Sequence, residues 1–330
     1  MHGYYREKVK SWLHSVLDTA EEQHEAPVIE EVQSSVPEKP AEEEKHVEKE
    51  RKKNTELQRP VQEYMECLQD DSSLLAVHPE LDRLEKALLD ALEPYCVTAT
   101  LPCGSRIFIR PILPIDKIVM KDLIETGEIS QHSLSLRFNS VITKVMDSSL
   151  DYFCNVNFDS HFAIAVLIEE GGIWKGVASG RFIQDTSNPK EAEWAAIVVD
   201  SRHGHKIGSY VLYYLSVLAH RFGIDKLMAV VHPENFCVLH WMKKLSATRL
   251  FKEECYYWVF DTPIEKSWIA SEEVRNALEV GANGKTELSE EMRSVLVSDI
   301  RELKNYQKSE MHHESFIGSR RNMSVHPEGK

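Results

Sequence analysis

The chain has 330 residues, of which 28% are charged, and its formal net charge is −14 at pH 7. Residues 1–100 contain 12 lysines and arginines against 23 aspartates and glutamates, a balance that excludes the basic footprint of a nucleic-acid-binding protein. No apolar run approaches the roughly 18 residues that span a bilayer, and the six cysteines show no CxxC spacing. We therefore expect a soluble, intracellular (cytoplasmic) protein without a membrane span, a secretory signal or a structural zinc site.

Three segments are expected before the main apolar region. Residues 1–24 predict an amphipathic helix, which either packs on its own protein or docks a partner; Glu7 and Asp18 weaken the case for a membrane surface. Residues 25–60, rich in Glu and Lys, predict a disordered acidic linker because they are too polar to repay the entropy of ordering. Residues 61–95 return to helical spacing and predict a helical segment.

Residues 96–262 predict a compact α/β (α+β) region, in which short apolar strands alternate with amphipathic helices. This order implies a mixed central sheet with helices on both faces. The expected strands cover residues 106–110, 163–168, 176–182, 194–199, 226–231 and 256–260. The expected helices cover residues 115–125, 148–155, 208–222 and 235–245. Further helices are predicted in residues 263–311, and a disordered tail in residues 312–330.

The most informative stretch is DSRHGHKIGSYVL at residues 200–212, which joins a strand to a helix through a turn containing Gly204 and Gly208. The start of a helix leaves backbone N–H groups unpaired where the helix dipole is positive, and this favours phosphate or pyrophosphate binding. Glycines in such a turn allow close approach of the backbone. Taken alone the signal is weak, because many α/β proteins share this arrangement without binding phosphate.

Several segments in order strengthen it. The turn resembles the acetyl-CoA pyrophosphate loop of the GNAT superfamily of N-acetyltransferases, and EAEWAAIVVD (191–200) resembles the strand before that loop. RIFIRPILPID (106–116), Ser133 with LRF (136–138), VNFDSHFAIAV (156–166), GVASGRF (176–182) and VHPENFCVL (231–239) are similar to segments of bacterial Pat-type protein lysine acetyltransferase domains. The resemblance covers about residues 98–262 and implies a GNAT fold, whose sheet splays between its fourth and fifth strands.

Two departures from the family pattern stand in the loop. His203 replaces its leading Gln or Arg, and Lys206 replaces a Gly. If that position needs a positive φ, Lys206 carries a strain of roughly 1 kcal/mol or more, which its ammonium offsets by reaching a phosphate. The alternative is a remodelled loop that binds the cofactor weakly or not at all. A third departure from the wider superfamily is Met242, which stands where many members have a Tyr general acid.

The resemblance assigns the general base to Glu193, whose apolar neighbours would raise its pKa toward a useful value. The alternative from sequence alone is an ordinary solvated carboxylate, and Glu191 is the second choice for the base. An N–H near Val198, where the family's strand has a bulge, is expected to hold the oxyanion. The residues expected to bind acetyl-CoA are Ile197, Val198, Val199, His203, Gly204, His205, Lys206, Ile207, Gly208, Ser209 and Asn235.

For Asn235, capping of its own helix is the expectation from the residues themselves. His161 either lines the acceptor pocket or makes a hydrogen bond in the core, and no spacing of His, Cys and Asp suggests a metal site. The resulting hypothesis is an acetyl-CoA-dependent N-acetyltransferase that transfers the acetyl group directly, with acetyl-CoA as cosubstrate, a protein lysine as acceptor and docking of partners through the N-terminal helices. Two alternatives are transfer to a small-molecule amine, and a non-catalytic acyl-CoA-binding regulatory or scaffold protein.

Overall fold

The computed structural model describes residues 57, 59–68, 79–142, 145–252, 255–303 and 306. The predicted helix at 1–24, nearly all of the predicted linker at 25–60 and the predicted tail at 312–330 lie outside these residues. Residues 57, 59 and 60 are helical, so the helix that we expect from residue 61 includes them. How the chain divides into domains stays a prediction.

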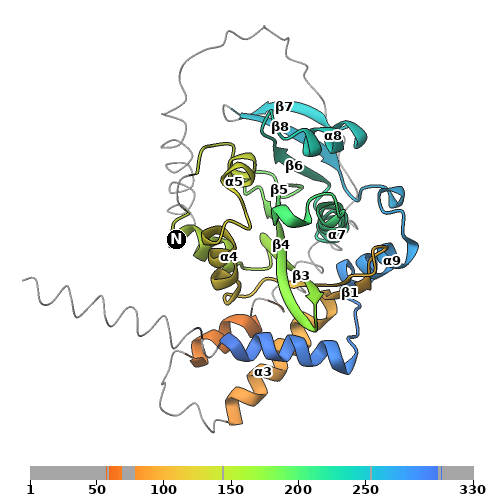
Figure 1. The fold of residues 1–330 in the computed structure, drawn as a ribbon. Coiled ribbons are helices and arrows are strands. Elements are labelled where there is room, and N and C mark those ends of the chain that lie inside the picture. The colour runs from red at the N-terminus through yellow and green to blue at the C-terminus, as the bar shows by residue number, and fades with distance from the viewer. Residues whose placement is uncertain are drawn as a thin grey trace, which may run out of the picture.

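The centre of the described chain is an eight-stranded sheet of order β1-β2-β3-β4-β5-β6-β8-β7 (Figure 1). Only the β5–β6 pair is parallel, and the other pairs are antiparallel. The predicted mixed sheet is therefore confirmed, although β1 and β7 were not among the expected strands. The strands are β1 Val97–Thr100, β2 Arg106–Pro111, β3 His161–Glu170, β4 Ile173–Gln184, β5 Glu191–Val198, β6 Lys226–Val230, β7 Thr248–Lys252 and β8 Cys255–Asp261.

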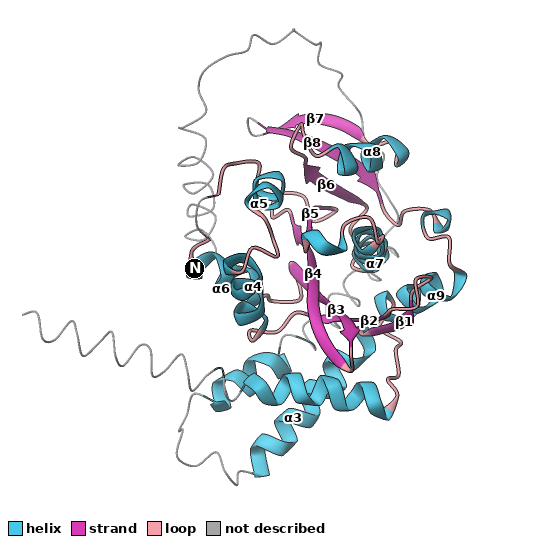
Figure 2. Cartoon of the chain, viewed as in Figure 1, coloured by secondary structure: helices cyan, strands magenta, loops and turns pink. Residues whose placement is uncertain are grey.

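Helices cover both faces of this sheet, as predicted (Figure 2). On one face lies α7, so close that a Cβ added at Gly180 would be 2.3 Å from Cγ1 of Val211. On the other face, α4 brings Cγ1 of Val119 to 3.0 Å from a Cβ added at Gly176. The helices are α3 Pro79–Leu92, α4 Asp116–Glu125, α5 Gln131–Phe138, α6 Asp147–Cys154, α7 Ile207–Arg221, α8 Phe236–Lys244 and α9 Glu272–Ala282, with a further helix at 290–303.

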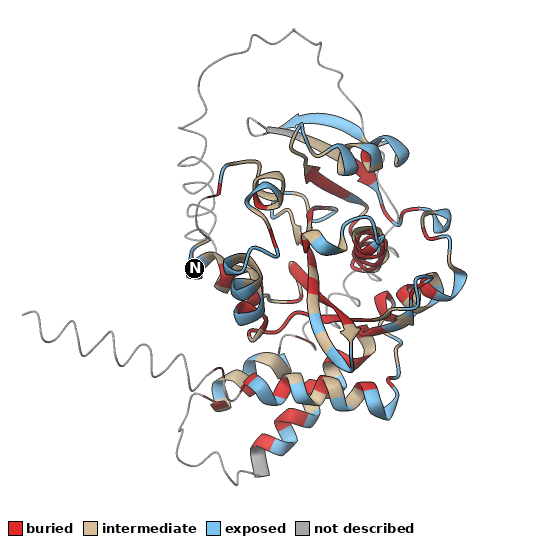
Figure 3. Cartoon of the chain, in the orientation of Figure 1, coloured by how far each residue is buried: buried red, intermediate tan, exposed pale blue. Residues whose placement is uncertain are grey.

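Segments from both ends of the chain form a layer of helices beside β1–β3 (Figures 1 and 3). The hydroxyl of Tyr64 lies 3.5 Å from the carbonyl oxygen of Ile300, and Arg301 pairs with Glu85 of α3 at 2.8 Å. The apolar faces of these helices belong to the same hydrophobic cluster as the sheet. Within the described residues, no helix has both the length and the apolar character that crossing a membrane requires.

Candidate functional site

The sheet opens between β5 and β6. The strand β5 pairs with β4 from Ala192 to Val198, but it pairs with β6 only at Glu191, Ala192 and Glu193. From Trp194 onward, no strand of the described chain lies beside the edge of β5 that faces β6. This is the predicted splay, which falls between β5 and β6 in the present labels because β1 precedes the family's first strand.

The register shows which backbone groups of β5 face the opening. The N–H of Val199 donates to the carbonyl of Val177 in β4 at 2.9 Å. Because these groups alternate along an antiparallel ladder, Ile197 also faces β4, whereas Ala196 and Val198 face the opening. Among Ile197, Val198 and Val199, only Val198 directs its backbone into the opening.

The bulge that we expect near Val198 is not there, because the β4–β5 register runs without a shift. The irregularity lies one strand away: in the β3–β4 register Val166 pairs with Ala178 and Leu167 with Gly176, so Val177 is skipped. The bulged Val177 is the residue that accepts the N–H of Val199. The strand that bends is therefore β4, and β5 stays regular along the opening.

The turn after β5 presents a row of free amides. Among the described residues, no backbone carbonyl accepts the N–H groups of Gly204, Lys206, Ile207, Gly208 or Ser209. The first backbone hydrogen bond at the start of α7 runs from the N–H of Tyr210 to the carbonyl oxygen of Lys206 at 3.1 Å. Amides at a helix start point away from its N-terminus, where the dipole is positive. The turn therefore has the donors that a pyrophosphate requires.

Two positions in this turn have positive φ. Gly204 has φ 80°, and Lys206 has φ 65° and ψ 7°, which is the left-handed helical region. Lys206 therefore does occupy the kind of position where the family's glycine is expected. Gly208 has a different reason for lacking a side chain, because a Cβ there would lie 2.8 Å from Cη2 of Trp241 on α8.

His203 and Asn235 both contact the backbone near the opening. The Nε2 atom of His203 lies 3.0 Å from the carbonyl oxygen of Val198. This contact uses the carbonyl of Val198 and leaves its N–H able to donate to a ligand. The Oδ1 atom of Asn235 accepts the N–H of Val238 at 3.2 Å, so Asn235 caps α8 as its residue type predicts. Met242, two residues before the end of α8, is fully buried and offers no acid.

Glu193 lies opposite Ile183 of β4, at the last residue where β5 still pairs with β6. Its side chain is open to solvent, but the surrounding protein displaces enough water that desolvation raises the pKa of Glu193, while the positive charge of Arg137 acts to lower it. Both properties are expected of a carboxylate on the wall of an opening, because solvent can reach it while protein atoms fill most of its surroundings. Such a group is a better base near neutral pH than a fully solvated carboxylate.

Three side chains that the sequence did not single out as functional lie on the side of α5 and α6. They are Arg137 on α5, Tyr152 on α6 and Arg181 on β4. The charge of Arg137 acts on Glu193, while burial and the charge of Glu193 both act to raise the pKa of Tyr152. His161 joins them, with Nε2 3.4 Å from a nitrogen of Arg181. Because a guanidinium only donates, this Nε2 accepts, and burial followed by the charge of Arg181 lowers the pKa of His161 well below its usual value. His161 is therefore a neutral hydrogen-bonding residue of the core.

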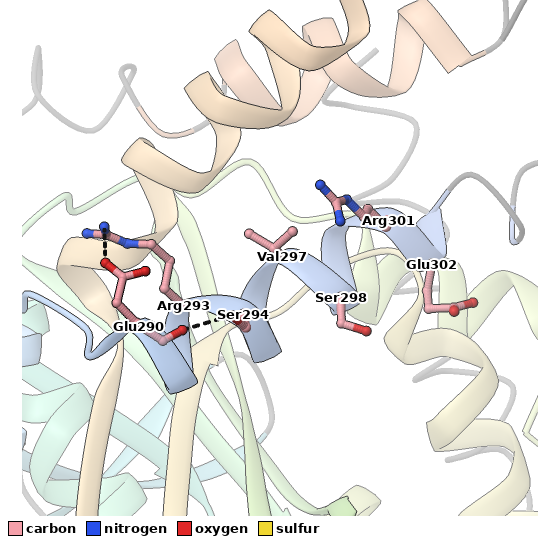
Figure 4. Close-up of a pocket in the computed structure, with 7 residues that line it drawn as sticks. All are labelled: Glu290, Arg293, Ser294, Val297, Ser298, Arg301 and Glu302. Atoms are coloured by element: carbon pink, nitrogen blue, oxygen red, sulfur yellow. Dashed lines mark hydrogen bonds and ion pairs between the residues drawn. The ribbon is translucent and has the colours of Figure 1, made fainter. Parts of the chain in front are cut away.

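Two hollows lie away from Glu193. A cavity of about 230 Å³ separates α4 from the sheet, with Val119, Trp174 and Ile197 in its wall. A shallow surface groove of about 540 Å³ follows the helix at 290–303 (Figure 4), where Arg293 and Arg301 are already paired with carboxylates. Within the described residues, no group of three His, Cys, Asp or Glu side chains is arranged to hold a metal ion.

Known proteins resemble this arrangement. Over 144 residues the chain is 32% identical to acetyltransferase Pat of Mycolicibacterium smegmatis, in an alignment covering 44% of this chain and 42% of that protein. The chain thus spans less than half the length of this curated relative. No family model matches the chain.

Solved structures resemble it as well. The GNAT domain of S. lividans PAT has 22% identity and a TM-score of 0.45, covering 51% of this chain and 97% of that one. A cAMP-binding acyltransferase from Mycobacterium smegmatis has 23% identity and a TM-score of 0.40, covering 64% of this chain and 62% of that one. The chain is thus similar in sequence to the acetyltransferase Pat, and its structure has a sheet that opens beside Glu193 and a turn with free amides after β5.

Proposed function

We propose that the protein is an acetyl-CoA-dependent N-acetyltransferase whose acceptor is a lysine side chain of another protein. The observation that carries the proposal is one continuous path, from Glu193 along the unpaired edge of β5 to the free amides of Gly204 and of residues 206–209. A long thioester needs this combination: donors for its pyrophosphate, a strand edge for its amide-containing arm and a base at the far end.

The direct transfer divides its steps among these residues. Glu193 accepts a proton from the acceptor amine, whose reference pKa near 10.4 keeps it charged at neutral pH. The freed nitrogen attacks the thioester carbonyl, and the N–H of Val198, which faces the opening, donates to the oxyanion that forms. The nitrogen then gives up its second proton to solvent, the carbon–sulfur bond breaks and the amide is released. The thiolate of CoA takes a proton from solvent, and Glu193 returns its own proton to water before the next turnover.

Protein acceptors are favoured over small amines by the resemblance of the segments quoted above to Pat-type protein lysine acetyltransferase domains. A non-catalytic acyl-CoA-binding protein would need the amides of the turn but no base. The raised pKa of Glu193 beside the opening therefore favours an enzyme over such a scaffold.

The test uses the full chain, acetyl-CoA and a peptide library with a central lysine, and follows release of the CoA thiol. We expect Glu193→Gln to leave the Kd for acetyl-CoA within about twofold and to lower kcat by about 10²- to 10⁴-fold. Glu191→Gln is the matched control, one step along the same face of β5, and should lower kcat by less than about threefold. Unchanged turnover in Glu193→Gln would exclude it as the base, and failure of acetyl-CoA to bind the wild type would refute the proposal as a whole.

The pH profile gives an independent check. A base must be deprotonated to act, so kcat/KM of the wild type falls as pH drops through the pKa of Glu193, and desolvation places this limb above the value of an ordinary glutamate. Glu193→Gln should lack the acid limb and retain a flat residual rate. An acid limb that persists in this variant belongs to another group.

A further inference from the structure

Two arginines stand near Glu193, on the side of α5 and α6, and aromatic rings lie against them. The Arg137 guanidinium carbon lies 5.0 Å from the centre of the Phe138 ring, and that of Arg181 lies 4.5 Å from the Phe153 ring. The two rings are stacked on each other, with centroids 5.8 Å apart and an interplanar angle of 21°. The order cation, ring, ring, cation ties α5, α6 and β4 into one wall, which we name the arginine wall (Arg137, Phe138, Phe153 and Arg181).

Register places this wall beside the base. Arg181 pairs with Ala195 across the β4–β5 ladder, and Glu193 is two residues from Ala195 on the same face. Diagonal neighbours of this kind have Cβ atoms within about 7–8 Å. Arg137 belongs to α5, which packs directly on β5. The wall and Glu193 therefore face the same volume.

Among the described residues, neither arginine has a carboxylate within hydrogen-bond distance, and Glu193 is the carboxylate whose charge acts on Arg137. Arg181 is 5% exposed, and its nitrogens contact only the carbonyl of Phe153, Nε2 of His161 and the hydroxyl of Ser179, at 3.0–3.4 Å. Arg137 has the ring of Phe138 but no hydrogen-bond acceptor. Burial and the charge of Arg137 lower the pKa of Arg181 to about 10, which is the mark of a cation without a counter-charge.

Arg110 is a second buried arginine, and its guanidinium is paired with carboxylates. Arg110 is 3% exposed; two of its nitrogens bind Asp116 at 2.8 and 2.9 Å, and a third binds Asp299 at 2.7 Å. Two carboxylates surround one cation there, whereas two cations stand near one carboxylate at the wall. Beside Glu193 there is thus an excess of positive charge, in a protein whose net charge is −14.

This balance has a consequence for the acceptor. A lysine ammonium that approaches Glu193 is repelled by the wall unless its own molecule brings a negative charge. A guanidinium presents parallel N–H donors that fit a carboxylate bidentately. We propose that Arg137, with Arg181 behind it, selects acceptor lysines that are flanked by Asp or Glu, and binds the flanking carboxylate.

This inference rests on the proposed acetyl transfer, and its test is designed to separate the two. Three peptides share every residue except the two that flank a central lysine, which are Asp, Asn or Lys. Full-length protein at saturating acetyl-CoA is expected to give a kcat/KM at least about tenfold higher for the Asp peptide than for the Asn peptide, as a hydrogen bond to a charged group supplies. The Lys-flanked peptide should be the poorest.

Variants assign the preference to the wall. In Arg137→Gln the ratio of kcat/KM for the Asp peptide to that for the Asn peptide should fall to about one, whatever the absolute rate. Arg137→Lys keeps the charge but loses the parallel N–H donors of the guanidinium, so its ratio should be intermediate. Lys175→Gln is the control: it removes one exposed cation at the β3–β4 turn and should keep the wild-type ratio. Urea midpoints confirm that each variant is folded.

Three results overturn the inference. Equal kcat/KM for the Asp and Asn peptides refutes it and leaves the acetyltransferase proposal standing. A preference for succinyl-CoA over acetyl-CoA that Arg137→Gln abolishes would show that the wall binds the acyl group instead of the acceptor. Absence of transfer to every peptide, in protein that binds acetyl-CoA, rejects the lysine acceptor and this inference together.

Discussion

Lys206→Gly should stabilise the fold slightly and weaken acetyl-CoA binding, two effects of opposite sign from one substitution. With φ 65° and ψ 7°, Lys206 is in the left-handed region, where a residue with a Cβ costs about 1–2 kcal/mol. Glycine removes that cost, but its freer unfolded chain costs about 0.5–1 kcal/mol. The expected net gain in the free energy of unfolding is roughly 0–1.5 kcal/mol.

The loss in binding comes from the ammonium. The Lys206 side chain is exposed at the start of α7, so its attraction to a phosphate is screened like that of a surface ion pair, about 0.2–1 kcal/mol. This energy corresponds to a Kd for acetyl-CoA that is about 1.5- to 5-fold weaker. The five free amides of the turn remain, and binding is therefore reduced and not lost.

Two further variants separate conformation from charge. Lys206→Asn tolerates the left-handed region and lacks the ammonium, so its Kd should match that of Lys206→Gly. Ser246→Gly relieves a φ of 53° after the end of α8, away from the turn, and should raise stability without changing the Kd. Urea titration and isothermal titration of acetyl-CoA into the full chain measure the two quantities.

Either half of this reasoning can fail separately. A lower urea midpoint for Lys206→Gly would refute the strain at this residue. An unchanged Kd in both Lys206 variants would show that the ammonium does not reach the phosphates.

Two packing predictions follow. Gly180→Ala should destabilise the fold by about 1–3 kcal/mol, because its Cβ would lie 2.3 Å from Val211 and 3.0 Å from Leu215 of α7; an unchanged urea midpoint would contradict this close approach. Asp116→Ala should cost about 3–5 kcal/mol, because it removes the bidentate partner of the buried Arg110. Arg59→Gln, which breaks an exposed pair four residues apart, is its control and should cost under about 0.5 kcal/mol in the same denaturation assay.

Local patterns predicted the part of the site that is contiguous in sequence. The strand at 191–198, the turn and α7 follow each other directly, so apolar spacing and two glycines pointed to the turn, and the resemblance strengthened that weak signal. A left-handed backbone at Lys206 was raised only as a condition, because the resembling family has a glycine at this position. The splay was predictable only through the resemblance, because sheet pairing is a non-local property.

The arginine wall was not predictable in this way, since its members come from α5, α6 and β4. One signal was available: Arg181 interrupts the apolar strand GVASGRF, and a charge inside a buried strand calls for an explanation. Arg137 stood in a motif that was matched but given no role. The helix α5 itself was missed, although Ser130 is a good N-cap and its side chain does accept the N–H of Ser133.

Short elements account for the other misses. The strand β1 has four residues, alternating with threonine, and in β7 the side chains of residues 248–251 are all exposed. Neither has enough periodicity to stand out from a loop. Both lie at the edges of the sheet, where pairing to one neighbour decides the structure.

The layer of helices beside β1–β3 can be completed only late in the synthesis of the chain. Glu85 pairs with Arg301, which is 216 residues downstream, and Glu93 pairs with Arg293, which is 200 residues downstream. At about 5–20 residues per second, a ribosome needs roughly 10–40 s to make that intervening chain. During that interval the apolar faces of the early helices have no final cover, and the nascent chain must keep them from other surfaces. Among the described elements, the helix at 290–303 thus covers segments made about 200 residues earlier, and a stop codon before residue 290 would release a chain that lacks Arg293, Arg301 and the helix carrying them.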